Sequence, residues 1–120
     1  MRGRLSSFKY AFEGIKSLWK SEANMRIHFV LLASVICLAC FFAISRTEWI
    51  LVVLSATLVL VSEALNTSIE KVCDFMEPNI NPKIKTIKDV SAAAVLFAAL
   101  GAFAVGCIIF LPKIIHLFAR

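Results

Sequence analysis

The sequence predicts an all-α membrane protein, with an N-terminal amphipathic surface helix followed by three transmembrane helices. Of its 120 residues, 60% are hydrophobic, whereas soluble domains typically contain about 45–50%. Two long stretches carry almost no charge, and a helix needs about 20 such residues to cross a bilayer. Basic residues flank these stretches and form no single face, so the net charge of +5 indicates membrane orientation rather than nucleic-acid binding. We therefore expect residues 1–120 to form one membrane-embedded domain.

The first predicted element is an amphipathic surface helix over residues 6–22. Apolar and charged side chains recur there at helical spacing, on two separate stripes. The apolar stripe comprises Phe8, Phe12, Ile15 and Trp19, and the charged stripe comprises Lys9, Glu13, Lys16 and Lys20. An aromatic face opposite a Lys-rich face suits the boundary between lipid headgroups and acyl chains. Packing of this helix on a soluble partner is the alternative.

Three transmembrane spans are expected at residues 26–45, 49–70 and 90–111. The second begins at Trp49, a residue type that anchors helices at the membrane interface, and should continue as helix to about Asp74. Pro78 and Pro82 then end that helix, because proline lacks the backbone N–H of an intrahelical hydrogen bond. The third span is uncharged throughout and is expected to stop at Pro112.

The Lys and Arg residues beside the spans predict the orientation of the chain. Six lie before the first span or at its first residue and four lie between the second and third, against three on the other side. Cytosolic loops carry an excess of these residues, so the N-terminus and residues 71–89 are expected in the cytosol. Three spans are few for an enclosed active site, so we also expect self-association through small residues of the third span, unless these have no specific role. They are Ala92, Ala93, Ala94, Ala98, Ala99 and Gly101.

Four polar residues of the second span share one stripe of its surface. Glu63, Asn66, Glu70 and Asp74 lie at positions i, i+3, i+7 and i+11, which face the same way on a helix. A carboxylate in the middle of a membrane costs about 2–3 kcal/mol on insertion scales, so it indicates a functional site. An interhelical hydrogen bond or ion pair that fixes an oligomer is the structural alternative.

The depth of each carboxylate in the membrane predicts its chemistry. Glu63, the deepest, is placed to act as a general base toward a hydroxyl at the membrane surface. Glu70 lies about 10 Å closer to the cytosol at a rise of about 1.5 Å per residue, where metal binding is the more fitting role. Mg²⁺ needs only one or two carboxylates besides nucleotide phosphates. Glu22 is a candidate for the second carboxylate, with a solvated surface Glu as the alternative.

Other motifs carry weaker signals. Lys88 and Asp89 precede the third span, where a Lys can meet phosphate oxygens and an Asp can cap a helix. The four glycines are dispersed, so the sequence contains no glycine-rich phosphate loop. Cys37 and Cys40 have the spacing of half a zinc site, but no second pair or nearby His completes it.

Three stretches resemble the prokaryotic diacylglycerol kinases. They are residues 22–26, residues 63–74 with the sequence EALNTSIEKVCD, and residues 88–96 with the sequence KDVSAAAVL. The resemblance covers nearly the whole chain and implies a homotrimer in the bacterial inner membrane, with active sites at subunit contacts. It also implies transfer of the γ-phosphate of ATP, with Mg²⁺, to the hydroxyl of diacylglycerol, giving phosphatidic acid.

The resemblance also implies roles for individual residues. Glu63 would be the catalytic proton acceptor, and Asn66 and Asp74 would belong to a supporting polar stripe. ATP binding would involve Tyr10, Glu22, Glu70, Lys88 and Asp89, with Glu22 and Glu70 also serving as metal ligands. Lipid contacts would come from Trp19, Arg26, Glu63 and Ala92. The chain departs from the family at two places. Asn79-Ile80-Asn81 stands in the nucleotide loop, which leaves contacts of that loop to the base open, and Gly3, flanked by Arg2 and Arg4, stands in place of an N-terminal arginine.

Two alternatives to a diacylglycerol kinase stay open. Residues 24–28 resemble the branch of the family found in Gram-positive bacteria, several members of which phosphorylate undecaprenol to undecaprenyl phosphate. From a different class, a non-catalytic oligomeric membrane subunit would use the carboxylate stripe only to hold helices together. A proton or ion pathway fits poorly, because the outer halves of the spans are almost purely apolar.

Overall fold

The computed structural model describes residues 3–120, and these form helices joined by short connections. The helices are α1 (Arg4–Ser21), α2 (Ala23–Phe41), α3 (Arg46–Met76) and α4 (Pro82–Phe118). Helices α2, α3 and α4 are each long and apolar enough to cross a membrane. The predicted all-α class with three membrane-crossing helices is therefore confirmed. Arg2, which contributed to the predicted charge balance and to the family comparison, lies outside the described residues.

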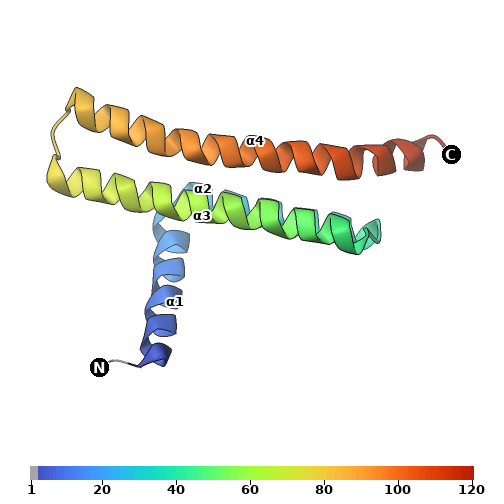
Figure 1. Cartoon of the computed structure of the whole chain (residues 1–120), viewed down its shortest axis with the longest axis horizontal. Helices are drawn as coiled ribbons and strands as arrows, with labels where there is room; N and C mark the ends of the chain where they lie inside the picture. The colour runs from blue at the N-terminus through green and yellow to red at the C-terminus, as the bar shows by residue number, and fades with distance from the viewer. Residues whose placement is uncertain (1–2) are drawn as a thin grey trace.

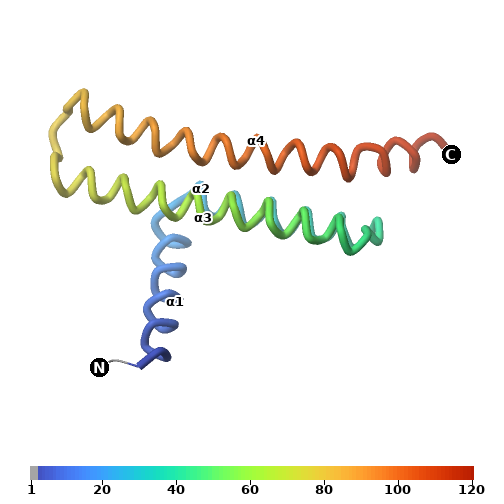
Figure 2. Tube along the Cα trace, in the orientation of Figure 1, coloured from blue at the N-terminus to red at the C-terminus, as the bar shows by residue number. Residues whose placement is uncertain are grey.

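The three long helices run side by side, and α1 leaves them at a steep angle (Figure 1). The backbone trace in Figure 2 shows α4 running along α3, with α2 behind α3. Helix α3 packs most extensively on α4 and less extensively on α2. Helix α1 contributes no buried residue, as expected for a surface helix whose apolar face is free to meet lipid.

An elbow at Glu22 joins α1 to α2. Glu22 has an extended backbone, so it ends one helix and begins the next. The guanidinium of Arg26 reaches back and donates to the carbonyl oxygens of Trp19 and Lys20, at 2.9 and 3.3 Å. The ring of Trp19 also packs on Phe29, with 5.6 Å between ring centroids. A cation that binds the last carbonyls of a helix stabilises that helix end, so Arg26 fixes the elbow.

A capped turn closes the far end of the bundle. Ala43 has a φ of 48°, a left-handed conformation that lets the chain reverse between α2 and α3. Ser45 Oγ accepts a hydrogen bond from the Glu48 backbone at 3.2 Å, and Glu48 Oε1 accepts one from the Ser45 backbone at 3.0 Å, a reciprocal capping box. Glu48 Oε2 also lies 3.1 Å from Lys113 Nζ on α4. A buried apolar cluster includes Ala39, Ile44, Val52, Ile109 and Phe110.

Helix α4 begins earlier than the sequence predicted. Asn81 Oδ1 accepts a hydrogen bond from the Lys83 backbone at 2.9 Å, and Pro82 lies in the first turn. The missing N–H of proline costs little there, because the first N–H groups of a helix have no partner within it. The cap is therefore Asn81 and not Asp89. The connection between α3 and α4 shrinks to residues 77–81.

Helix α4 also continues through Pro112, where we expected it to stop, and ends at Phe118. A proline inside a helix removes one backbone hydrogen bond and crowds the preceding turn. Contacts on either side of Pro112 offset this cost: Phe110 is buried in the apolar cluster, and Lys113 pairs with Glu48. Tertiary contacts thus override the local stop signal.

Candidate functional site

The polar stripe of α3 passes from the buried interior of the bundle to its exposed end. The exposed fraction is 2% for Glu63 and 8% for Asn66. Glu70 is half-buried and Asp74 is exposed. The stripe therefore connects a buried carboxylate to one that is exposed, as expected from the spacing of these residues.

Asn66 is bound to α4. Ser91 Oγ donates a hydrogen bond of 2.7 Å to Asn66 Oδ1, and both side chains are buried. A buried amide needs such a partner, because leaving it unpaired costs about 1–3 kcal/mol. This bond fixes the register between α3 and α4 in the middle of the stripe.

Lys88 lies at the exposed end of the stripe, before the uncharged run that begins at Val90. Its ammonium forms an ion pair with Asp74 across the two helices. The hydrogen bond to the Asp74 carboxylate raises the pKa of Lys88 above its usual value, and the nearby charge of Glu70 adds to this effect. Asp89, by contrast, pairs with Lys85 on its own helix at 2.6 Å. The structure thus brings Lys88, Asp74 and Glu70 together.

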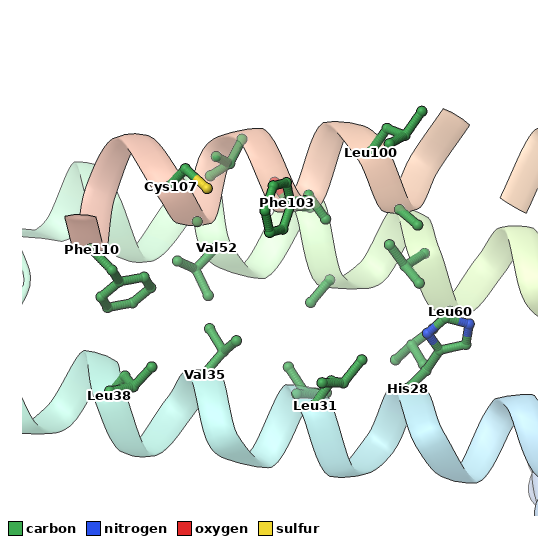
Figure 3. A pocket seen from close by; sticks show the side chains of 18 of the residues that line it. His28, Leu31, Val35, Leu38, Val52, Leu60, Leu100, Phe103, Cys107 and Phe110 are labelled. Atoms are coloured by element: carbon green, nitrogen blue, oxygen red, sulfur yellow. The ribbon is translucent and has the colours of Figure 1, made fainter. Parts of the chain in front are cut away.

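Glu63 faces α2. Its Oε2 lies 3.5 Å from Nε2 of His28. His28 in turn lines an apolar cavity of about 580 Å³ between α2, α3 and α4. Figure 3 shows the imidazole beside Leu60 at one end of this cavity, with Leu38 and Phe110 at the other end. Other lining residues include Leu31, Val35, Val52 and Phe103.

Glu22 and Glu70 have the donor chemistry that Mg²⁺ requires. Both residues are partly buried, and within residues 3–120 neither carboxylate has a hydrogen bond or an ion pair. The same residues contain no group of three or more His, Cys, Asp or Glu side chains that would enclose a metal by themselves. Each carboxylate has the oxygen chemistry of a ligand to an ion that takes its remaining ligands from phosphates and water.

The remaining predicted residues lie outside this cluster. Tyr10 and Trp19 are on α1, and Tyr10 is about 18 Å from Glu22 along the helix axis, at about 1.5 Å per residue. Arg26 holds the elbow, and Ala92 is exposed on α4. In the 77–81 connection, Ile80 is fully exposed, while the Asn81 side chain caps α4.

Comparison of the sequence with known proteins identifies a family. The profile of the prokaryotic diacylglycerol kinases matches residues 9–110, which is most of the chain. The chain belongs to the prokaryotic diacylglycerol kinase family. This confirms the resemblance of the three stretches at residues 22–26, 63–74 and 88–96. Only residues near the two ends, including Gly3 and Arg4, fall outside the match.

Members of this family with curated names resemble the chain along most of its length. A diacylglycerol kinase of Synechocystis is 33% identical over 94% of the chain, which spans 65% of that relative. An undecaprenol kinase of Bacillus subtilis is 32% identical over 90% of the chain and 88% of the relative. A diacylglycerol kinase of Escherichia coli K12 is 30% identical over 83% of the chain and 82% of the relative. The family therefore contains enzymes named for two different lipid alcohols.

Sequence reasoning missed two residues of the site, Ser91 and His28. Ser91 has no role of its own in the sequence analysis, where it is part of the stretch at residues 88–96. It lies one helical turn beyond Lys88 and therefore faces the same way. His28 gave a usable signal, because a His inside a span is rare and usually faces the bundle interior. Neither pattern in the sequence identifies the partner, which is Asn66 for Ser91 and Glu63 for His28.

Proposed function

We propose that this chain transfers the γ-phosphate of ATP, with Mg²⁺, to the hydroxyl of diacylglycerol, giving phosphatidic acid. Membership of the family makes it a lipid kinase, and the acceptor, the metal and the residue roles are the proposal. One observation carries it: a buried carboxylate, Glu63, is joined by a continuous polar stripe to a lysine at the exposed end of the same helix pair. In this proposal, the lipid hydroxyl reacts at the buried end of the stripe, and Lys88 at the exposed end contacts ATP.

Glu63 acts as the general base in this proposal. It takes the proton of the lipid hydroxyl as that oxygen attacks the γ-phosphorus, and ADP leaves. General bases contribute about 10²–10⁴-fold to such reactions. A position shielded from water also protects the phosphoryl group from hydrolysis. Asn66, held by Ser91, supports the stripe next to Glu63.

Lys88 meets the phosphates of ATP, because an ammonium at the exposed end of the stripe attracts phosphate oxygens. Asp74 holds Lys88 in place. Tyr10 and Asp89 are proposed to contact the rest of the nucleotide. Glu22 and Glu70 would hold Mg²⁺, which when bound neutralises charge on the transferring phosphates. Trp19, Arg26 and Ala92 are proposed as lipid contacts, next to Glu63 itself.

We further propose a homotrimer in the bacterial inner membrane, with the N-terminus and residues 71–89 in the cytosol. The excess of Lys and Arg on that side supports the orientation. Large apolar side chains are exposed along all three long helices, and these surfaces need lipid or another subunit as cover. The distance of Tyr10 from the rest of the site supports a nucleotide site shared between subunits.

Undecaprenol is the second candidate acceptor. The undecaprenol kinase of Bacillus subtilis matches the chain at an identity close to that of the diacylglycerol kinases, and the match covers 88% of its length. Residues 24–28, which include His28 beside Glu63, also resemble the Gram-positive branch.

Incubation of the purified chain with radiolabelled ATP, Mg²⁺ and one lipid at a time tests the proposal. Label in phosphatidic acid well above label in undecaprenyl phosphate supports diacylglycerol as the acceptor, and the reverse order supports the alternative. Omission of Mg²⁺ should abolish both products. Failure to label either lipid, with ATP unconsumed, would favour the non-catalytic membrane subunit.

A further inference from the structure

We propose that His28 is a positioning residue for the reaction: its Nε2 donates to the carboxylate of Glu63 and fixes the orientation of the general base. The inference rests on the proposed function, because it assigns Glu63 as the base. It adds a residue from α2 to the polar stripe, whose other members lie on α3 and α4, and it explains what a buried carboxylate binds in an apolar environment.

The side chains of His28 and Glu63 form a pair between α2 and α3. Nε2 of His28 lies 3.5 Å from Oε2 of Glu63, and the exposed fractions of the side chains are 18% and 3%. Within residues 3–120, the Glu63 carboxylate has no second ion pair or hydrogen bond. An ordinary N–H···O hydrogen bond is about 2.7–3.2 Å long, so a small adjustment brings the pair to that length.

Two cations of the candidate site, Arg26 and Lys88, have other partners. Arg26, two residues before His28 on α2, donates to the carbonyls at the end of α1. Lys88 pairs with Asp74 at the exposed end of the stripe. Among the described residues, His28 is the one whose side chain forms an ion-pair contact with the Glu63 carboxylate, and burying a carboxylate without a donor is costly.

The location of His28 also gives it access to the reacting lipid. It lines one end of the apolar cavity between the three long helices (Figure 3), whereas Glu63, 3.5 Å from its Nε2, is not a lining residue. An acceptor hydroxyl that approaches Glu63 from this cavity meets a carboxylate whose free oxygen is set by the imidazole. A misplacement of about 1 Å can reduce a rate about 100-fold, so orientation of this oxygen matters.

Three substitutions separate positioning from packing. His28→Gln keeps an N–H donor as many bonds from Cα as Nε2 is, whereas His28→Asn places it one bond short and His28→Leu removes it. We expect kcat to fall about 10- to 100-fold in the Asn and Leu variants, with KM for ATP and lipid within about twofold. The Gln variant should recover most of kcat. His116→Asn, on the last turns of α4, is the matched control and should retain wild-type kcat.

Three results would overturn the role of His28. They are a kcat within twofold of wild type in His28→Asn, an equal loss in His28→Gln, and a loss confined to KM for the lipid. An inactive wild-type chain counts against the proposed function instead, so the two failures are distinguishable.

A measurement on the pair itself needs no activity. The chain has two histidines, so ¹⁵N-histidine labelling gives one set of signals from His28 and one from His116. Replacing Glu63 by Gln should move the Nε2 signal of His28 and leave that of His116 in place. Equal behaviour of both signals would show that Nε2 does not donate to Glu63, whatever the variants do to assembly.

Discussion

Ser91 Oγ on α4 lies 2.7 Å from Asn66 Oδ1 on α3, and both residues are buried. The two residues are 25 positions apart, yet the connection at residues 77–81 is short enough to bring them to the same level. The bond lies between Glu63, buried, and Lys88, half-buried at the exposed end. It therefore sets the position of the proposed base, Glu63, relative to the proposed phosphate-binding residue, Lys88.

Removing the hydroxyl of Ser91 should destabilise the pair of helices. Hydrogen bonds between membrane helices contribute about 0.6 kcal/mol on average and up to about 1.7 kcal/mol, so Ser91→Ala should lower the free energy of unfolding within that range. Denaturant unfolding in mixed micelles measures it. Ser68→Ala is the control, because Ser68 Oγ donates to the Ala64 carbonyl of its own helix. Equal effects of both substitutions would contradict an interhelical role for Ser91.

Replacing Thr67 should have the opposite effect. Thr67 is 2% exposed and its Oγ1 is buried without a hydrogen-bond partner among the described residues. An unpaired buried hydroxyl costs about 1–3 kcal/mol, and Val has nearly the same shape as Thr. Thr67→Val should therefore raise the free energy of unfolding by about 1 kcal/mol in the same assay. A loss of stability would show that another subunit or lipid supplies a partner.

The polar stripe and its partner Ser91 show what could and could not be predicted from the sequence. Helical periodicity placed Glu63, Asn66, Glu70 and Asp74 on one face, because the period of a helix is fixed by its geometry. It gave no register between helices, since that depends on where Asn81 begins α4. The expected start near residue 90 left Ser91 without a defined neighbour. The predicted stop of the last helix at Pro112 was wrong, because contacts with another helix outweighed the tendency of proline to end a helix.

Glu63→Gln should abolish phosphate transfer to lipid and leave the assembled protein intact. The amide keeps the shape of the carboxylate but cannot accept the proton, so kcat should fall at least about 100-fold. The transfer assay with radiolabelled ATP measures kcat, and size-exclusion chromatography measures assembly. Asn66, as a neighbour on the stripe without a proton role, provides the comparison: Asn66→Ser should retain more activity. Undiminished turnover in Glu63→Gln would rule out Glu63 as the base.

Lys88→Met should weaken ATP binding, whereas Lys85→Met should not. Lys88 pairs with Asp74 across the helices, while Lys85 pairs with Asp89 on the surface of α4. Losing a charged contact to phosphate costs about 1.5–3 kcal/mol, so KM for ATP should rise at least about tenfold in Lys88→Met. Steady-state kinetics at saturating lipid measures this rise. A similar rise in both variants would point to net charge rather than a specific contact.

Arg26→Gln should loosen the elbow between α1 and α2. Arg26 donates to the carbonyls of Trp19 and Lys20 at 2.9 and 3.3 Å, and a neutral, shorter side chain cannot bind both at the same strength. With Trp49 replaced by Phe, Trp19 is the remaining tryptophan, so its fluorescence reports on this end of α1. Its emission should shift and its anisotropy should fall in Arg26→Gln. Arg46→Gln, at the far end of the bundle, should leave both unchanged. An unaltered Trp19 signal in Arg26→Gln would mean that the packing of Trp19 on Phe29 holds the elbow by itself.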